Sequence, residues 1–160
     1  MTTIGIDPGY ARVGYGVVDY ANNRFRVLEY GVISTKAQTP FPQRLEEIYT
    51  GLCGLFVKYS PHGFAIEKLF FNTNAKTAID VAQARGVLVL AAQKYGMQVA
   101  EYTPLQIKQS VCGYGRAEKM QMQEMTRLLL NLPSIPKPDD AADALACAVC
   151  HCHTTGCKKL

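Results

Sequence analysis

A short apolar run that ends in an acid constrains this chain more than any other feature of its sequence. Residues 4–6 (Ile-Gly-Ile) lead directly into Asp7, and Pro8-Gly9 then turns the backbone. The run predicts a buried strand with Asp7 at its end. An ionised carboxylate is costly to bury unless it is paired or binds metal, so Asp7 needs a partner. Strand ends are also where α/β proteins usually bind ligands, which indicates a functional site.

Size and composition favour one globular unit. With 160 residues, 48% of them hydrophobic, the chain can bury a sizeable core, and we expect a single domain over residues 1–160. No apolar run approaches the ~18 residues that a membrane span needs. The N-terminal residues lack the basic and apolar regions of a signal peptide. We therefore expect a cytoplasmic protein that does not associate with membranes.

The charge balance favours a polyanionic partner. The chain has 17 Lys and Arg residues against 13 Asp and Glu, for a net charge of +4. This excess is weak on its own. If four of the acids form a metal site, however, the remaining surface is distinctly basic. A basic surface around a metal-neutralised centre favours binding of nucleic acid.

Alternating and helical periodicities predict the order of the elements. The expected strands are residues 3–6, 13–20, 26–35, 64–67 and 97–102. The expected helices are residues 42–59, 75–95, 104–111, 117–130 and a last one from about residue 139. This order predicts an α/β protein with a five-stranded mixed sheet, in which three antiparallel meander strands join parallel strands between flanking helices. The first and fourth strands are expected near the centre of the sheet.

Two of the helices carry more specific expectations. In residues 117–130, four side chains are expected as apolar contacts, namely Met120, Met125, Leu128 and Leu129. The helix over residues 75–95 is rich in small residues, which permit close packing: Ala78, Ala82, Ala84, Gly86 and Ala91. The partner of that small-residue surface is either a second copy of the chain or the protein's own sheet.

Acids recur at positions that converge on Asp7. Glu67 ends the fourth strand, and neighbouring strands lie ~4.8 Å apart. Asp140 and Asp143 share one face at the start of the last helix, with Asp139 beside them. A helix start favours one acid, but three in five residues exceed what a cap requires. Converging carboxylates repel unless cations lie among them, and hard oxygen ligands suit Mg²⁺ or Mn²⁺. Two such ions ~4 Å apart commonly promote attack of water on a phosphodiester.

Cysteine and histidine residues crowd the C-terminal end of the chain. They are Cys147, Cys150, His151, Cys152, His153 and Cys157. The favoured interpretation is that Cys147 and Cys150 are small apolar residues on an Ala-rich helix. The alternative is a zinc site, although the ligand pairs are closer together than in the usual zinc ribbons and fingers.

Five motifs together resemble the RuvC family of bacterial Holliday-junction resolvases. They are residues 5–9 (GIDPG), 65–67 (AIE), 82–86 (AQARG), 115–119 (GRAEK) and 140–146 (DAADALA). The resemblance covers nearly the whole chain, in order. It implies an RNase H-like fold and a homodimeric, Mg²⁺-dependent endonuclease that nicks two opposed strands of a four-way DNA junction. It also implies two Mg²⁺ ions per site, with Mn²⁺ as a substitute, and a partner complex of the RuvA and RuvB type for branch migration.

The resemblance carries over to individual acids. Asp7, Glu67, Asp140 and Asp143 match the catalytic, metal-binding acids of the family. Asp7 is expected to contact both ions, Glu67 and Asp143 one each, and Asp140 an ion or the attacking water. Asp139 does not match the pattern, and we interpret it as a helix-start acid.

The resemblance also suggests residues that bind DNA. Lys108 and Lys119 match basic residues that act at the DNA and the scissile phosphate, so Lys119 is also a candidate catalytic residue. Arg116 is a further candidate for DNA contact. Phe70 matches an aromatic residue that contacts junction bases, and Phe71 shares that role or packs in a dimer interface.

Three other functions are compatible with parts of the sequence. The residues 5–9 also resemble the phosphate loop of actin-like ATPases and sugar kinases, but those proteins need two such domains. Another RNase H-like nuclease would share the acids and cut RNA or simpler branched DNA. A junction-binding module without catalysis would not need the complete set of acids.

Overall fold

A five-stranded mixed sheet forms the centre of the computed structural model, which describes residues 1–69 and 75–156. The strands are β1 (Thr2–Asp7), β2 (Arg12–Ala21), β3 (Arg24–Ser34), β4 (Gly63–Glu67) and β5 (Val99–Tyr102). Their order is β3-β2-β1-β4-β5, with β1 antiparallel to β2 and parallel to β4. The predicted meander and the central positions of the first and fourth strands are therefore confirmed.

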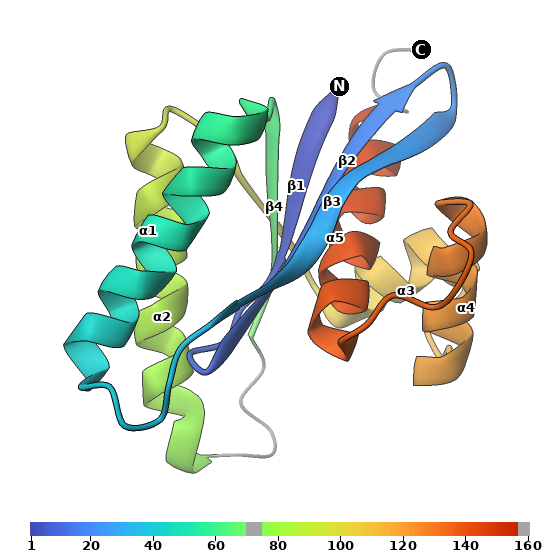
Figure 1. Ribbon diagram of the computed structural model, residues 1–160. Helices are drawn as coiled ribbons and strands as arrows, with labels where there is room; N and C mark the ends of the chain where they lie inside the picture. The colour runs from blue at the N-terminus through green and yellow to red at the C-terminus, as the bar shows by residue number, and fades with distance from the viewer. Residues whose placement is uncertain (70–74, 157–160) are drawn as a thin grey trace.

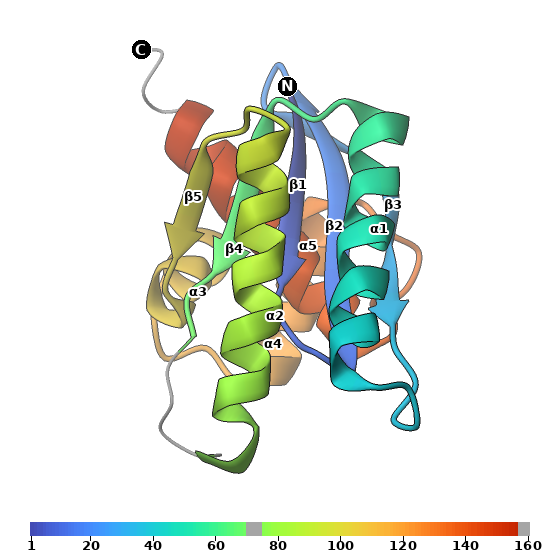
Figure 2. The same ribbon diagram turned by 90° about the vertical axis from the view of Figure 1, so that its left-hand side faces the viewer.

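Helices cover both faces of this sheet. They are α1 (Phe41–Tyr59), α2 (Ala75–Lys94), α3 (Pro104–Cys112), α4 (Lys119–Leu129) and α5 (Asp139–Gly156). In Figures 1 and 2, α1 and α2 lie side by side on one face, whereas α5 crosses the other face with α3 and α4 beyond it. Among the described helices, none combines the length and the hydropathy that a membrane span requires.

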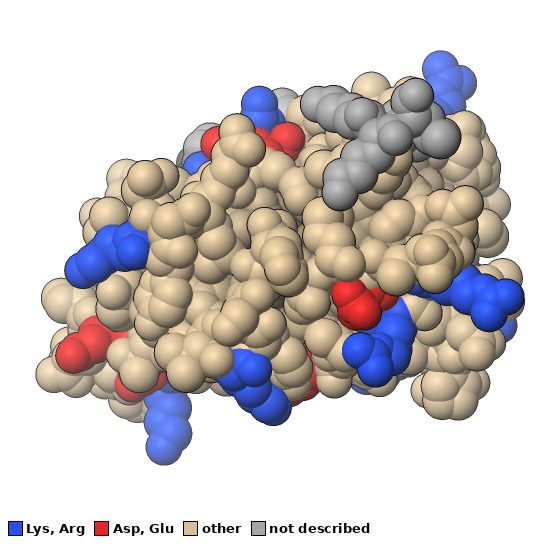
Figure 3. All heavy atoms as spheres, turned by 90° about the horizontal axis from the view of Figure 1, so that it is seen from above, with Lys and Arg blue, Asp and Glu red and all other residues tan. Residues whose placement is uncertain are grey.

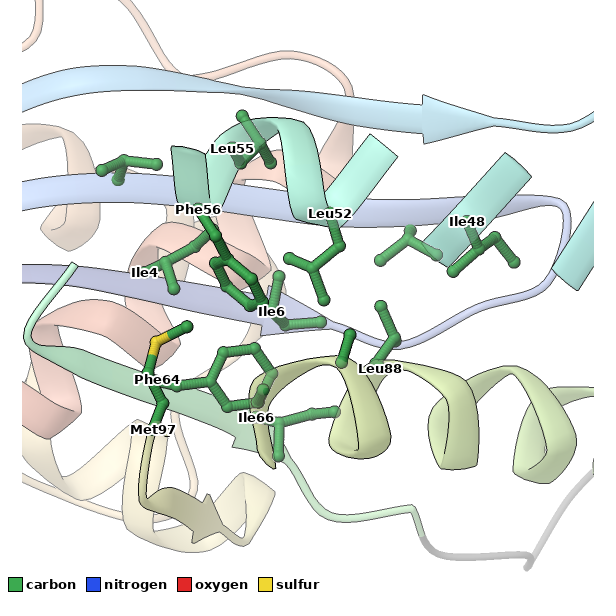
Figure 4. Packing of buried hydrophobic residues seen from close by; sticks show 14 of the residues in the cluster. Ile4, Ile6, Ile48, Leu52, Leu55, Phe56, Phe64, Ile66, Leu88 and Met97 are labelled. Atoms are coloured by element: carbon green, nitrogen blue, oxygen red, sulfur yellow. The ribbon is translucent and has the colours of Figure 1, made fainter. Parts of the chain in front are cut away.

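Successive side chains of β1 point to opposite faces of the sheet, and each face is covered by its own layer of the hydrophobic core. The first layer lies under α1 and α2, and the second lies under α5. Ile4 and Ile6 are fully buried on the side of α1 and α2, where they meet Phe64 and Leu52 (Figure 4). Full burial of such a side chain contributes about 1.5–3 kcal/mol, so this layer fixes β1 firmly in the middle of the sheet. The Asp7 backbone is held in place by the same strand.

Two glycines allow α5 to lie directly on the opposite face. A Cβ atom added to Gly5 would lie 2.2 Å from the carbonyl oxygen of Ala144, and one added to Gly14 would lie 2.0 Å from that of Asp140. No larger residue fits at either position without moving the helix. The close approach brings the acidic first turn of α5 to the end of β1.

The apolar face of α4 agrees only in part with the one expected, since two of the four predicted contacts, Met125 and Leu129, pack against the core. Met120 is 65% exposed and Leu128 is also exposed, whereas Met122, Gln123 and Thr126 face inward. The helix begins at Lys119 rather than at residue 117. A hydrophobic side chain can be left at the surface, so the apolar pattern of a short helix does not by itself fix its buried face.

The small residues of α2 divide between two faces. Ala84 and Ala91 are buried against the core, whereas Ala82 and Gly86 are exposed. Packing on the protein's own sheet, one of the two alternatives, therefore accounts for only part of the set.

The end of the molecule that carries the N-terminus is shown in Figure 3. Lys, Arg, Asp and Glu side chains lie scattered over this face, and most of its visible surface is uncharged. The acids that end β1 and β4 lie at the opposite end of the sheet.

Candidate active site

Two parallel strands deliver the first two acids to one edge of the sheet. Ile6 of β1 pairs in register with Ile66 of β4, and Asp7 and Glu67 are the next residues of the two strands. Because the strands run in the same direction, both carboxylates reach the same edge. Strand β1 ends at Asp7, and Pro8 and Gly9 follow it directly.

The first turn of α5 delivers the other two acids to this edge. Asp140 and Asp143 lie three residues apart, so they share a face of the helix. The helix reaches them over the glycine positions of β1 and β2, where no side chain separates it from the sheet. The structure thus brings together acids from three separate elements.

Asp7 is the most perturbed carboxyl group of the site. Its pKa rises from 3.8 to about 8, first because the group is buried and then because Glu67, Asp143 and Asp140 repel a second negative charge. Lys119 opposes this rise only weakly, as the smallest of the contributions. The three other acids therefore all act on Asp7 across the site.

Glu67 and Asp143 are perturbed in the same direction. Burial and the Asp143 charge raise the pKa of Glu67 to about 7, while Lys108 lowers it. Burial is also the main cause that raises the pKa of Asp143. Oxygen donors destabilised by burial and by one another are stabilised by a divalent cation, so this donor set fits one.

A pocket opens beside these acids. It has a volume of about 220 Å³ and is lined by Glu67, Pro104, Ile107, Lys108, Lys119, Met122, Asp143 and Ala146. Apolar side chains from α3, α4 and α5 line part of its wall, while two acids and two lysines supply the charge. A phosphate beside the carboxylates would therefore meet positive charge from Lys108 and Lys119.

Local signals set the positions of these two lysines. Helix α3 begins with a capping box, in which the Thr103 and Gln106 side chains each bond the other's backbone N–H, and Lys108 follows one turn later. Lys119 is the first residue of α4. Its Nζ lies 2.9 Å from Asp139 Oδ2 and 4.0 Å from Asp143 Oδ2. The hydrogen bond with Asp139 is the main cause that raises the pKa of Lys119.

Sequence reasoning missed one cation of this edge. The Nε of Arg12, at the start of β2, lies 3.4 Å from Asp140 Oδ2. Its position follows from the strand register, in which Gly14 pairs with Asp7 and residue 12 lies just beyond the acid, so no local sequence signal could have identified it. Arg116 is exposed in the segment before α4. Phe70 and Phe71 lie outside the described residues.

The carboxylates interact without converging on a single point. Over residues 1–69 and 75–156, no three His, Cys, Asp or Glu side chains stand close enough together to hold one ion between them. Sharing an ion therefore requires the side chains of this cluster to rotate toward one another.

The cysteines of α5 belong to the second core layer. Cys147 and Cys150 are buried there, in agreement with their interpretation as small apolar residues, and Cys152 is buried beside them. His151 is also buried, and its Nδ1 lies 2.9 Å from the hydroxyl of Tyr102. Cys157 lies outside the described residues.

Comparison with known proteins gives a consistent result. Residues 3–151 match the model of the family described as "Crossover junction endodeoxyribonuclease RuvC". A protein of that name from Ruminiclostridium cellulolyticum is 58% identical over 151 residues, 94% of this chain and 91% of the relative. One from Alkaliphilus oremlandii is 55% identical over 154 residues, 96% and 94% of the two chains. The solved structure "T. thermophilus RuvC in complex with Holliday junction substrate" has 31% identity and a TM-score of 0.90, covering 98% and 96%.

Proposed function

This chain belongs to the RuvC family of crossover junction endodeoxyribonucleases and is a Holliday-junction resolvase, and we propose that it hydrolyses one phosphodiester in each of two opposed strands. Its fold is RNase H-like, as the motifs implied. The observation that carries the proposal is that acids from β1, β4 and α5 interact at one edge of the sheet, beside a pocket lined by two lysines. Residues 1–160 would form one nuclease domain that acts on DNA in the cytoplasm.

Metal dependence belongs to this family, and the donor set supports hard divalent cations. We propose two Mg²⁺ ions, replaceable by Mn²⁺, held by Asp7, Glu67, Asp140 and Asp143. A bound divalent ion lowers the pKa of a water molecule and stabilises the charge that develops on phosphate. Because the pKa values of Asp7 and Glu67 lie near or above neutrality, cation binding would displace protons from them.

Each side chain has a distinct part in this proposal. Asp7, at the centre of the acids, would contact both ions, whereas Glu67 and Asp143 would contact one each. Asp140 would orient an ion or the attacking water. Lys119, at the wall of the pocket, would stabilise the scissile phosphate in the transition state.

DNA binding would extend from the pocket over its rim. Lys108, Lys119 and the exposed Arg116 would contact phosphates, which supply much of the affinity of proteins for DNA. Phe70 and Phe71 follow Glu67 by only a few residues in the chain. Stacking of an aromatic side chain on an unpaired base contributes roughly 1–3 kcal/mol, so either residue would select the open centre of a junction.

A homodimer would supply one active site for each of the two strands. Helix α2 presents a stripe at helical spacing, formed by Ile79, Ala82, Gly86 and Leu90, and Ile79 is 70% exposed. Small residues between two large apolar ones allow a second helix to approach closely. A two-fold dimer matches the two-fold symmetry of a junction cut in opposed strands. We also propose a branch-migration complex of the RuvA and RuvB type as partner.

The decisive experiment is cleavage of a four-way junction with Mg²⁺ and mapped nicks. Symmetric nicks in two opposed strands are expected. Equal cutting of plain duplex, flap or RNA–DNA hybrid would instead indicate another RNase H-like nuclease. Turnover of ATP without DNA would indicate a phosphate-loop enzyme, and junction binding without cleavage at any metal concentration would indicate a binding module.

A further inference from the structure

We infer that Asp139 is a positioning residue, which holds the ammonium group of Lys119 at the wall of the catalytic pocket. The inference rests on the proposed function, because it concerns the same site. Asp139 lies outside the set of family acids and begins α5, where an acid is already favoured by the helix dipole. Its contacts give it a second role that a helix start does not require.

Both oxygens of the Asp139 carboxylate are bound by side chains of α4. Oδ2 lies 2.9 Å from Lys119 Nζ, and Oδ1 accepts a hydrogen bond of 3.1 Å from Gln123 Nε2. Gln123 is four residues after Lys119, so both side chains project from one face of the helix. Because Gln123 is only 6% exposed, its amide has little freedom, and it fixes the orientation of the carboxylate.

The fixed carboxylate determines which partner Lys119 takes. Asp143 Oδ2 stands 4.0 Å from the same Nζ and is the nearest alternative partner in the described structure. A full ion pair with Lys119 would occupy an oxygen that the proposed metal site needs. Asp139 therefore keeps the lysine near the pocket and at the same time leaves Asp143 available to a cation.

The pair contributes little to folding. Lys119 is 59% exposed and Asp139 is 48% exposed, and exposed ion pairs add little to the stability of a protein. Because Gln123 also holds the Asp139 carboxylate, and because the pair lies beside the catalytic pocket, positioning of Lys119 explains the contact better than stability does. Substitution of Asp139 should consequently leave a folded protein that can be assayed.

The test is a double-mutant cycle with Asp139→Asn and Lys119→Ala, measured as single-turnover cleavage of a four-way junction. Asp139→Asn preserves an oxygen for Gln123 and removes the charge that holds Lys119. We expect it to slow cleavage on the order of tenfold, as small displacements of catalytic groups do. Junction affinity should stay within about twofold. In the Lys119→Ala background, Asp139→Asn should change the cleavage rate no further.

A second readout does not depend on cleavage. Binding of Mn²⁺ to the junction-free protein, followed by electron paramagnetic resonance, should weaken in Asp139→Asn, because the released Lys119 competes for Asp143. It should recover when Lys119→Ala is added. Simple loss of a nearby negative charge would weaken binding equally in both backgrounds and would overturn the inference.

Two further variants complete the design. Asp139→Glu restores a carboxylate and should recover most of the cleavage rate. Glu124→Gln removes a half-buried ion pair with Arg127 from the same helix and should leave the rate unchanged. An unchanged rate in Asp139→Asn, or equal slowing in both Lys119 backgrounds, contradicts the inference. Failure of the unmodified protein to cut junctions would instead refute the proposed function.

Discussion

Two carboxylates on the same sheet show opposite electrostatics. Glu29 on β3 accepts hydrogen bonds from Lys58, Tyr59 and Tyr15, which lower its pKa to about 2. Asp7 on β1 is buried among other acids, and its pKa rises to about 8. Three partners within the protein stabilise the negative charge of Glu29, whereas no partner of comparable strength stabilises a charge on Asp7. Strain of the kind seen at Asp7 is concentrated at functional sites.

The largest expected effect is on junction cleavage, which should depend on Asp7 and not on Glu29. Asp7→Asn should lower junction cleavage on the order of a thousandfold or more, because it removes the central ligand of the proposed metal site. Junction binding, measured by gel shift in the same buffer, should persist. Glu29→Gln is the matched control and should cleave at close to the normal rate. Normal cleavage by Asp7→Asn would refute the assignment of the centre.

A change in the sheet should disrupt the acid cluster without altering any acid. Gly5→Ala places a Cβ atom 2.2 Å from the Ala144 carbonyl oxygen and must displace α5 from β1. We expect a loss of about 3 kcal/mol in the free energy of unfolding, as for other overpacked cores, together with loss of cleavage. Gly54→Ala, where nothing lies within 4 Å of the added atom, should not destabilise the protein. Urea denaturation of both variants distinguishes the two cases.

The pH dependence of stability sharpens the contrast further. A carboxyl group whose pKa is raised on folding favours the folded state only while protonated, so Asp7 should destabilise the metal-free protein progressively between about pH 4 and pH 8. Asp7→Asn should therefore raise the free energy of unfolding at pH 8 by on the order of 2 kcal/mol, and change it little at pH 4. Urea denaturation in EDTA measures both values.

Divalent cations should oppose the same destabilisation. At pH 8, Mg²⁺ or Mn²⁺ should raise the stability of the unmodified protein, because a ligand of the folded state stabilises it by mass action. The increase should be much smaller in Asp7→Asn. An equal increase in the two proteins would place the stabilising cation elsewhere.

The smallest expected effect is on the free energy of unfolding when Glu29 is replaced. A carboxyl group whose pKa is lowered on folding stabilises the protein above its unfolded pKa, and the contribution disappears as the pH falls toward about 2. Glu29→Gln should lower the free energy of unfolding at pH 7 by about 1 kcal/mol, since the contact is partly exposed and screened by solvent. A destabilisation that persists at pH 2 would show that packing, not charge, is responsible.

Local sequence determined most of the frame. The apolar run before Asp7 and the alternation of the next two segments were sufficient to predict the meander, because strand formation follows from a period of two. Motif spacing similarly identified Glu67, Asp140 and Asp143 as partners of Asp7 before their positions were known. The predicted boundaries of α4 and the predicted apolar contact of Met120 were wrong, because short helices carry too few apolar residues to define a face.

Tertiary structure alone decided which charges meet. Nothing in the sequence distinguishes Glu29, satisfied by two residues at the end of α1, from an acid that needs a cation. The contacts of Arg12 with Asp140 and of Asp139 with Lys119 join residues on separate elements, so no local pattern could reveal them. Sequence periodicity reports burial and backbone conformation, whereas electrostatic pairing depends on side-chain distances that arise only when the elements pack.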